Sequence, residues 1–100
     1  MATAYNNEGV KETNLDRSIS LFRKALKYDP ESRQIKENLA GALYAKGAKL
    51  IEGLRYSYEP RSVLSRVLML LREAHEYNPY SQEILNTHTQ VADVLKKLMF

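Results

Sequence analysis

The sequence predicts an all-α fold built from antiparallel helical hairpins. Apolar residues recur with a period near 3.6 along every long segment, and no stretch alternates as a strand does. In addition, the stretch 21–35 returns at 70–84, and seven of its fifteen positions are identical where average composition gives about one. Such a repeat indicates stacked helical units that bury apolar faces against each other. The identical pairs are Leu21/Leu70, Arg23/Arg72, Ala25/Ala74, Tyr28/Tyr77, Pro30/Pro79, Ser32/Ser81 and Ile35/Ile84.

Length and composition indicate one soluble globular domain over residues 1–100. The chain is 44% apolar and 27% charged, with a net charge of +3. It has no cysteine, which excludes disulfides, iron–sulfur clusters and thiolate zinc sites. No basic segment followed by an apolar run marks a secretory signal, and the densest apolar run, 67–71, is too short to span a bilayer. We therefore expect a cytoplasmic protein without a membrane segment.

The first half of the chain predicts three helices. We expect one over about residues 3–11 and a second over about 15–28, separated by Thr13-Asn14, which caps the second. Pro30 suits the first turn of the third helix, because its missing N–H costs nothing there. Asp29 is then the expected N-cap of that helix.

The end of the third helix is an open question in the sequence. Gly47 offers a stop, and we favour a break there, with a fourth segment that begins at Leu50 and ends before Pro60. A single glycine costs a helix only about 1 kcal/mol, which packing can override. One bent helix over about residues 31–58 is therefore the alternative.

The second half of the chain predicts two long helices. The helix over about 61–77 is apolar around much of its circumference, so we place it centrally, packed on more than one side. Asn78-Pro79 repeats the earlier junction, and the last helix begins at about Tyr80. The total is five to six helices, and the short loops predict antiparallel neighbours.

The repeated junction resembles the tetratricopeptide (TPR) repeat, a helix–turn–helix unit. The resemblance extends over essentially the whole chain and implies a right-handed α-solenoid of helical hairpins. The solenoid should be irregular, because Pro30, Pro60 and Pro79 are spaced by 30 and 19 residues rather than by the family's period of about 34. The signature positions are Ser18, Phe22, Ala25 and Pro30 in the first copy, Val67, Leu71, Ala74 and Pro79 in the second, and Leu39 in the phrase Asn38-Leu39-Ala40.

No motif for catalysis is visible. The sequence has no glycine-rich phosphate loop, no H-E-x-x-H and no nucleophile elbow. His75 and His88 fall on different predicted helices, so we interpret them as ordinary side chains rather than metal ligands. We expect no enzymatic activity, no cofactor and no metal.

The resemblance implies a concave face, lined by the first helix of each repeat, that binds a peptide or a helix of a partner protein. One subclass of the family clamps a C-terminal carboxylate, but Glu37 and Gly41 stand at the matching positions here and cannot form that clamp. We therefore predict an adaptor or scaffold with a different ligand, in which Tyr44 could anchor the partner. The predicted partner-binding residues are Gln34, Glu37, Asn38, Gly41, Tyr44, Asn86, Thr87 and Gln90.

Two alternative functions stay open. The first is a basic helical repeat that binds nucleic acid, although no nucleic-acid-binding signature is present and we do not expect such a partner. The second is a designed or fragmentary repeat protein without a cellular partner. The cations behind the first alternative are Arg23, Lys24, Lys27, Arg33 and Lys36. Three tyrosines near the predicted junctions, Tyr56, Tyr58 and Tyr80, could interleave with Arg55 and Arg61 and stack on bases.

The C-terminal end predicts an apolar contact. Leu98, Met99 and Phe100 follow an apolar stripe and have little chain left to cover them. An exposed patch of this kind commonly marks an interface, so we expect a homodimer or a missing neighbour at this end, and a two-fold homodimer is the simplest closed solution. The alternative is that Phe100 folds back onto the domain's own core.

Overall fold

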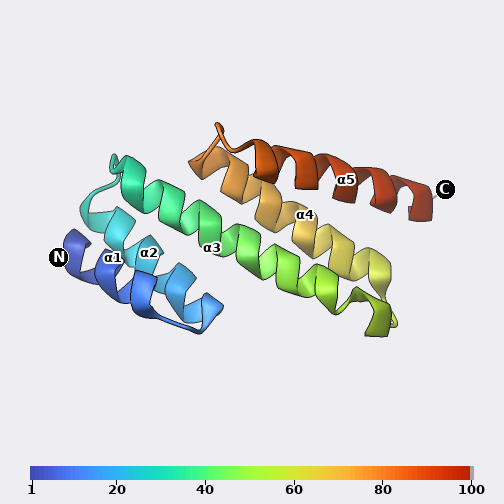
Figure 1. Cartoon of the computed structure of the whole chain (residues 1–100), viewed down its shortest axis with the longest axis horizontal. Coiled ribbons are helices and arrows are strands. Elements are labelled where there is room, and N and C mark those ends of the chain that lie inside the picture. The colour runs from blue at the N-terminus through green and yellow to red at the C-terminus, as the bar shows by residue number, and fades with distance from the viewer. Residues whose placement is uncertain (100) are drawn as a thin grey trace.

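The computed structural model describes residues 1–99 and contains five α-helices (Figure 1). The described residues contain no strand, which confirms the predicted all-α class. Within this part of the chain, no helix is both long enough and apolar enough to cross a membrane. The elements are α1 (Ala2–Lys11), α2 (Leu15–Tyr28), α3 (Arg33–Glu52), a short 3₁₀ turn (Leu54–Tyr56), α4 (Pro60–Tyr77) and α5 (Gln82–Met99).

Each helix packs on the next one in the chain, and the short connections make neighbours antiparallel. Figure 1 shows the α1–α2 hairpin at one edge of the row and α5 at the other. α4 lies between α3 and α5, as its apolar circumference predicts, and α3 is flanked in the same way by α2 and α4.

α3 continues through Gly47, so the predicted break there is wrong. Gly47 is buried, and a Cβ at this position would lie 3.6 Å from Cγ1 of Val67, which is ordinary contact. Burial of α3 against both α2 and α4 outweighs the cost of about 1 kcal/mol of a helical glycine. The interruption comes at Gly53 instead, where α3 ends, and the predicted fourth segment is reduced to the 3₁₀ turn.

The predicted start of α3 is also wrong. Asp29 is the C-cap of α2, and its amide N–H donates to the carbonyl of Ala25 at 3.1 Å. The helix ends here because a residue before proline is biased out of the helical region. Pro30 then lies in the turn, and α3 begins at Arg33. The N-cap is Ser32, whose hydroxyl oxygen accepts the amide N–H of Ile35 at 3.3 Å.

The α4–α5 junction repeats the α2–α3 junction in three dimensions. Asp29 has φ −144° and ψ 77°, and Asn78, 49 residues later, has φ −140° and ψ 77°. Asn78 donates to the carbonyl of Ala74 at 2.9 Å, and the hydroxyl of Ser81 accepts the amide N–H of Ile84 at 3.3 Å. The predicted start of the last helix at Tyr80 is therefore two residues too early, because Pro79 and Tyr80 form a turn and α5 begins at Gln82. At these junctions the sequence repeat is also a repeat of backbone conformation and capping.

The core runs along the row of helices. Its completely buried side chains include Ala25, Leu39, Leu43, Val67 and Ala74. The two alanines are completely buried, as small residues between packed helices should be. Of the predicted signature residues, Ser18, Phe22, Ala25, Leu39, Val67, Leu71 and Ala74 are buried, and Pro30 and Pro79 lie exposed in the two turns.

α1 is held against α2 by a close contact at Gly9. A Cβ at this position would lie 2.6 Å from Cε1 of Phe22, so only glycine permits the approach. The buried Ser18 hydroxyl donates to the carbonyl of Gly9 at 2.7 Å, which satisfies its polar group.

Candidate functional site

Two side-chain hydrogen bonds join α1, α3 and α5 to one another. Asn38 of α3 donates its Nδ2 to Oδ1 of the buried Asn6 of α1 at 2.9 Å. The hydroxyls of Tyr44 on α3 and Thr87 on α5 lie 3.2 Å apart. We call the surface formed by these three helices the odd-helix face.

On the other side of the row, α2 is joined to α4. The guanidinium of Arg23 donates two hydrogen bonds to the carboxylate of Glu73, one of them 3.1 Å long between Nη2 and Oε1. The hydrogen bond with Glu73 raises the pKa of Arg23, so this side chain stays charged. Asp16 of α2 also pairs with Lys46 of α3 at 2.7 Å. The hydrogen bonds between odd-numbered helices and the ion pair between α2 and α4 thus lie on different sides of the row.

The predicted partner-binding residues divide into two groups. Asn38, Tyr44 and Thr87 are half-buried and make the cross-helix contacts just described. The ring of Tyr44 also packs against the core, so it acts as a spacer between α3 and α5. The other five are exposed: Gln34, Glu37, Gly41, Asn86 and Gln90.

Three of the exposed residues differ in their freedom to meet a ligand. Glu37 accepts a hydrogen bond from Arg33 at 3.0 Å, and Asn86 accepts one from Gln82 at 3.0 Å, both within a single helix. At Gly41 an added Cβ would meet no atom within 4 Å, so the backbone of α3 is open here. A mid-helix glycine costs about 1 kcal/mol relative to alanine, and no packing contact within residues 1–99 requires a glycine at position 41.

An apolar hollow of about 210 Å³ lies where the end of α3 meets α4 and α5. Two predicted residues, Thr87 and Gln90, form its polar part. Val94, 46% exposed, continues the apolar surface along α5 toward Leu98, four residues on, which is 40% exposed. The lining residues are Ile51, Leu54, Leu64, Thr87, Gln90, Val91 and Val94.

The sequence prediction missed the apolar members of this hollow. Ile51 and Leu54 reach it because α3 continues past Gly47, and the predicted break had separated them from the rest of α3. The signal that could have found them was the apolar character of Val91 and Val94, one turn apart beside Gln90. A polar rim around an apolar floor is a common form of ligand site.

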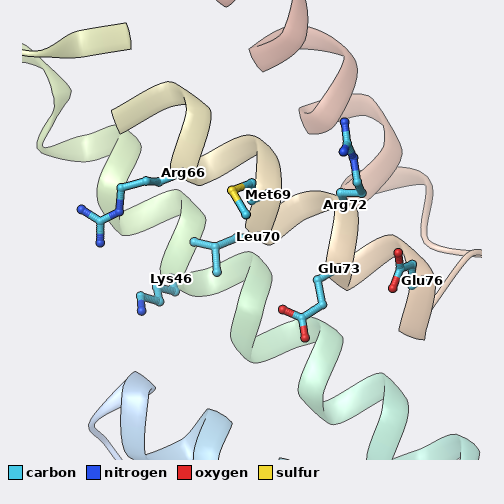
Figure 2. A pocket seen from close by; sticks show the side chains of 7 residues that line it. All are labelled: Lys46, Arg66, Met69, Leu70, Arg72, Glu73 and Glu76. Carbon is cyan, nitrogen blue, oxygen red and sulfur yellow. The ribbon is translucent and has the colours of Figure 1, made fainter. Parts of the chain in front are cut away.

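A larger hollow, of about 400 Å³, lies on the opposite side of the row (Figure 2). It carries charges of both signs, and two of them, Lys46 and Glu73, are occupied by ion pairs with α2. Figure 2 shows Arg72 and Glu73 pointing in opposite directions from α4. The lining residues are Lys46, Arg66, Met69, Leu70, Arg72, Glu73 and Glu76.

The basic residues that suggested nucleic-acid binding are partly engaged by the chain itself. Arg23 pairs with Glu73, and Arg33 pairs with Glu37. The ammonium of Lys24 lies 5.9 Å from the ring centroid of Tyr5. These contacts reduce the free positive charge of the predicted cluster.

The C-terminal residues of the predicted dimer contact are exposed as far as they are described. Leu98 is 40% and Met99 60% exposed, and Phe100 lies outside the described residues. Dimer formation therefore stays a prediction.

Residues 1–99 contain no group of three histidine, aspartate or glutamate side chains placed to hold a metal ion. Comparisons of the chain with protein-family models, with curated proteins and with solved structures found no match.

Proposed function

We propose that this protein is a non-catalytic binding module with a TPR-like architecture, and that its odd-helix face docks a segment of a partner protein. The module would act as an adaptor or scaffold. The apolar hollow at Gln90 and Val94 is the observation that carries the proposal, because it is an apolar concavity that two of the predicted binding residues, Thr87 and Gln90, help to line.

The arrangement of the helices supports the TPR-like part of the proposal. Hydrogen bonds link α1 to α3 and α3 to α5, while an ion pair links α2 to α4. Alternate helices therefore form two layers, which is how stacked helical hairpins bury a continuous core. The two similar junctions supply the repeated turn that such stacking needs.

The chemistry of the hollow supports an apolar ligand side chain as the anchor. Leu64 and Val91 are nearly completely buried at its floor, and Val94 adds exposed apolar surface at its edge. The side chains of Thr87 and Gln90 offer hydrogen-bonding groups for a ligand backbone. A large aliphatic or aromatic residue seated here would remove apolar area from water, at about 25 cal/mol per Å².

Gly41 supports a ligand that runs along α3. It lies three residues after Asn38 on the same face, and its open backbone would allow a second chain to approach closely. A ligand that extends from the hollow toward Gly41 would pass Tyr44 and then reach this open stretch of backbone.

Selection from a phage-displayed library of random dodecapeptides on the intact chain tests this proposal. We expect the selected peptides to share one large apolar residue and to bind Val94→Glu at least about tenfold more weakly, because the charge would enter the apolar hollow. Leu85→Glu is the matched control, since Leu85 is 41% exposed on another side of the same helix. Equal loss in both variants, or no enrichment of apolar peptides, would overturn the proposal.

A further inference from the structure

α4 packs against a surface of the α2–α3 pair, which is called its seat, and the contacts there show how one helical pair binds the next helix. Arg23 of α2 binds Glu73 of α4. On α3, Gly47 lies against Val67 and Leu71 of α4. The side of α3 that meets α4 also carries Ala40 and Leu43, which are completely buried.

The α4–α5 pair offers the equivalent seat with no helix of residues 1–99 on it. The α4–α5 pair repeats the α2–α3 pair 49 residues later. Adding 49 to the residues of α3 that face α4 therefore gives the corresponding side of α5. It carries Leu85, Ala92 and Met99, spaced by seven residues and so on one side of the helix, with the exposed Thr89 at the position of Ala40. Leu85 is 41% exposed and Met99 60% exposed. This side of α5, together with Arg72 of α4, is called the α4–α5 edge below.

The charges of the edge favour an acidic occupant. Arg72 occupies the position of Arg23, and Figure 2 shows its side chain directed away from Glu73. Lys96 occupies the position of Gly47, which adds a second exposed cation to the same side. Each cation has one acidic neighbour a turn away on its own helix, Glu76 after Arg72 and Asp93 before Lys96, but within residues 1–99 neither of these acids forms an ion pair with it.

The same charges disfavour a second copy of the chain. A two-fold contact between two such edges would bring Arg72 and Lys96 of one copy toward those of the other, and like charges in a contact are destabilising. Lys96 in place of Gly47 also prevents a helix from approaching as closely as α4 approaches α3, so the occupant must have room for this side chain.

We propose that the α4–α5 edge docks an acidic amphipathic helix of a partner protein. The helix would place an apolar stripe over Leu85, Ala92 and Met99, with one carboxylate on Arg72, as Glu73 lies on Arg23, and another on Lys96. This surface lies on a different side of α5 from the apolar hollow. The proposal goes beyond the peptide-binding function and does not depend on it.

An α4-like peptide is the natural probe, because α4 occupies the equivalent seat. The probe is the eighteen-residue sequence of α4 with its three arginines replaced by glutamate, labelled for fluorescence anisotropy with the intact chain. We expect saturable binding that weakens about tenfold for Arg72→Glu and is restored to that variant by a peptide with lysine at the position of Glu73. Binding should also weaken with salt.

Matched variants separate this contact from general electrostatics and from the hollow. Arg66→Glu makes the same charge change on α4 away from the edge and should leave the affinity within about twofold. Leu85→Glu should weaken the probe, and Val94→Glu, on the other side of α5, should not. Circular dichroism should show the same helicity in all four variants, so that lost binding reports the surface.

Three results would overturn the proposal. The first is no anisotropy change up to about 1 mM peptide. The second is equal weakening by Arg66→Glu and Arg72→Glu, which would indicate unspecific attraction. The third is sedimentation equilibrium showing a dimer that Leu85→Glu dissociates, which would make a second copy the occupant. Loss of dodecapeptide binding in Val94→Glu alone would leave this proposal standing and would concern only the hollow.

Discussion

Ala25 and Ala74 occupy the same position in the two copies of the repeat, and both are completely buried. Two residues earlier, Arg23 and Arg72 are also identical in sequence, yet only Arg23 makes an ion pair within residues 1–99. Tyr28 is exposed and stacks on Tyr5 with ring centroids 5.8 Å apart, whereas its counterpart in α4 is half-buried against the core. The repeat therefore conserves the inward side of the junction, and each copy's neighbours decide what the outward side does.

The largest expected effect tests the inward side. Leucine in place of Ala74 should lower the free energy of unfolding by about 1–3 kcal/mol, because this alanine is completely buried and a larger side chain would overpack the site. Ala25→Leu should cost a similar amount if the two copies are equivalent. Thermal melting of both variants measures this. An unchanged midpoint for either one would mean that the two positions are packed differently.

A pair of glycines sharpens the comparison between the edge and the middle of the row. Gly9→Ala should destabilise the protein by about 1–2 kcal/mol, because the new Cβ would lie 2.6 Å from the ring of Phe22. Gly47→Ala should stabilise it by about 0.5–1 kcal/mol, because its Cβ would meet Val67 at an ordinary 3.6 Å and the helix gains propensity. Urea denaturation of the two variants should give shifts of opposite sign; shifts of the same sign would be inconsistent with the packing at one of these glycines.

The two helix caps should be equally strong. Ser32→Ala and Ser81→Ala each remove a hydroxyl that accepts one amide hydrogen bond at the start of a helix, at 3.3 Å in both cases. Each should lower the free energy of unfolding by about 1 kcal/mol. Chemical denaturation measures both, with threonine at the same positions as the conservative control. A difference above about 1 kcal/mol between the two serines would break the equivalence of the junctions.

The smallest expected effect concerns the outward arginines. Arg23→Gln should cost about 0.2–1 kcal/mol, because its ion pair with Glu73 is partly exposed and screened by water. Arg72→Gln should change the free energy of unfolding by less than about 0.5 kcal/mol, since it lies exposed outside the described ion pairs. The two differences are best measured by denaturation at low and high salt, and only the Arg23 variant should lose its difference at high salt.

Much of the fold could be predicted because period and repeat depend on local chemistry. The ends of α2 and α4 and the buried alanines all follow from residues that act alone or with near neighbours. The length of α3 could not be predicted from local chemistry. The propensity of Gly47 favours a helix end, but Val67 and Leu71 of α4 lie against it and the helix continues. The cap at Ser32 was missed for a related reason. Asp29 and Ser32 are both good caps, and the turn at Pro30 decides between them.

The candidate site was predictable only in its polar part. The repeat resemblance predicts Thr87 and Gln90 as partner-binding residues, and both line the hollow. Ile51 and Leu54 depend on the length of α3 and on the 3₁₀ turn after it, and both are consequences of tertiary packing. The charge pairing of Arg23 with Glu73 spans fifty residues and has no local signal.

Methyl NMR spectra of the intact chain, recorded with and without a dodecapeptide selected on it, test the proposed binding face most directly. We predict that the largest shift changes fall on methyl groups of the apolar hollow, Ile51, Leu54 and Val94, while Met69 on the opposite side of the row stays unchanged. Largest changes at Met69, or small changes spread evenly over all methyl groups, would contradict the assignment of the odd-helix face as the binding surface.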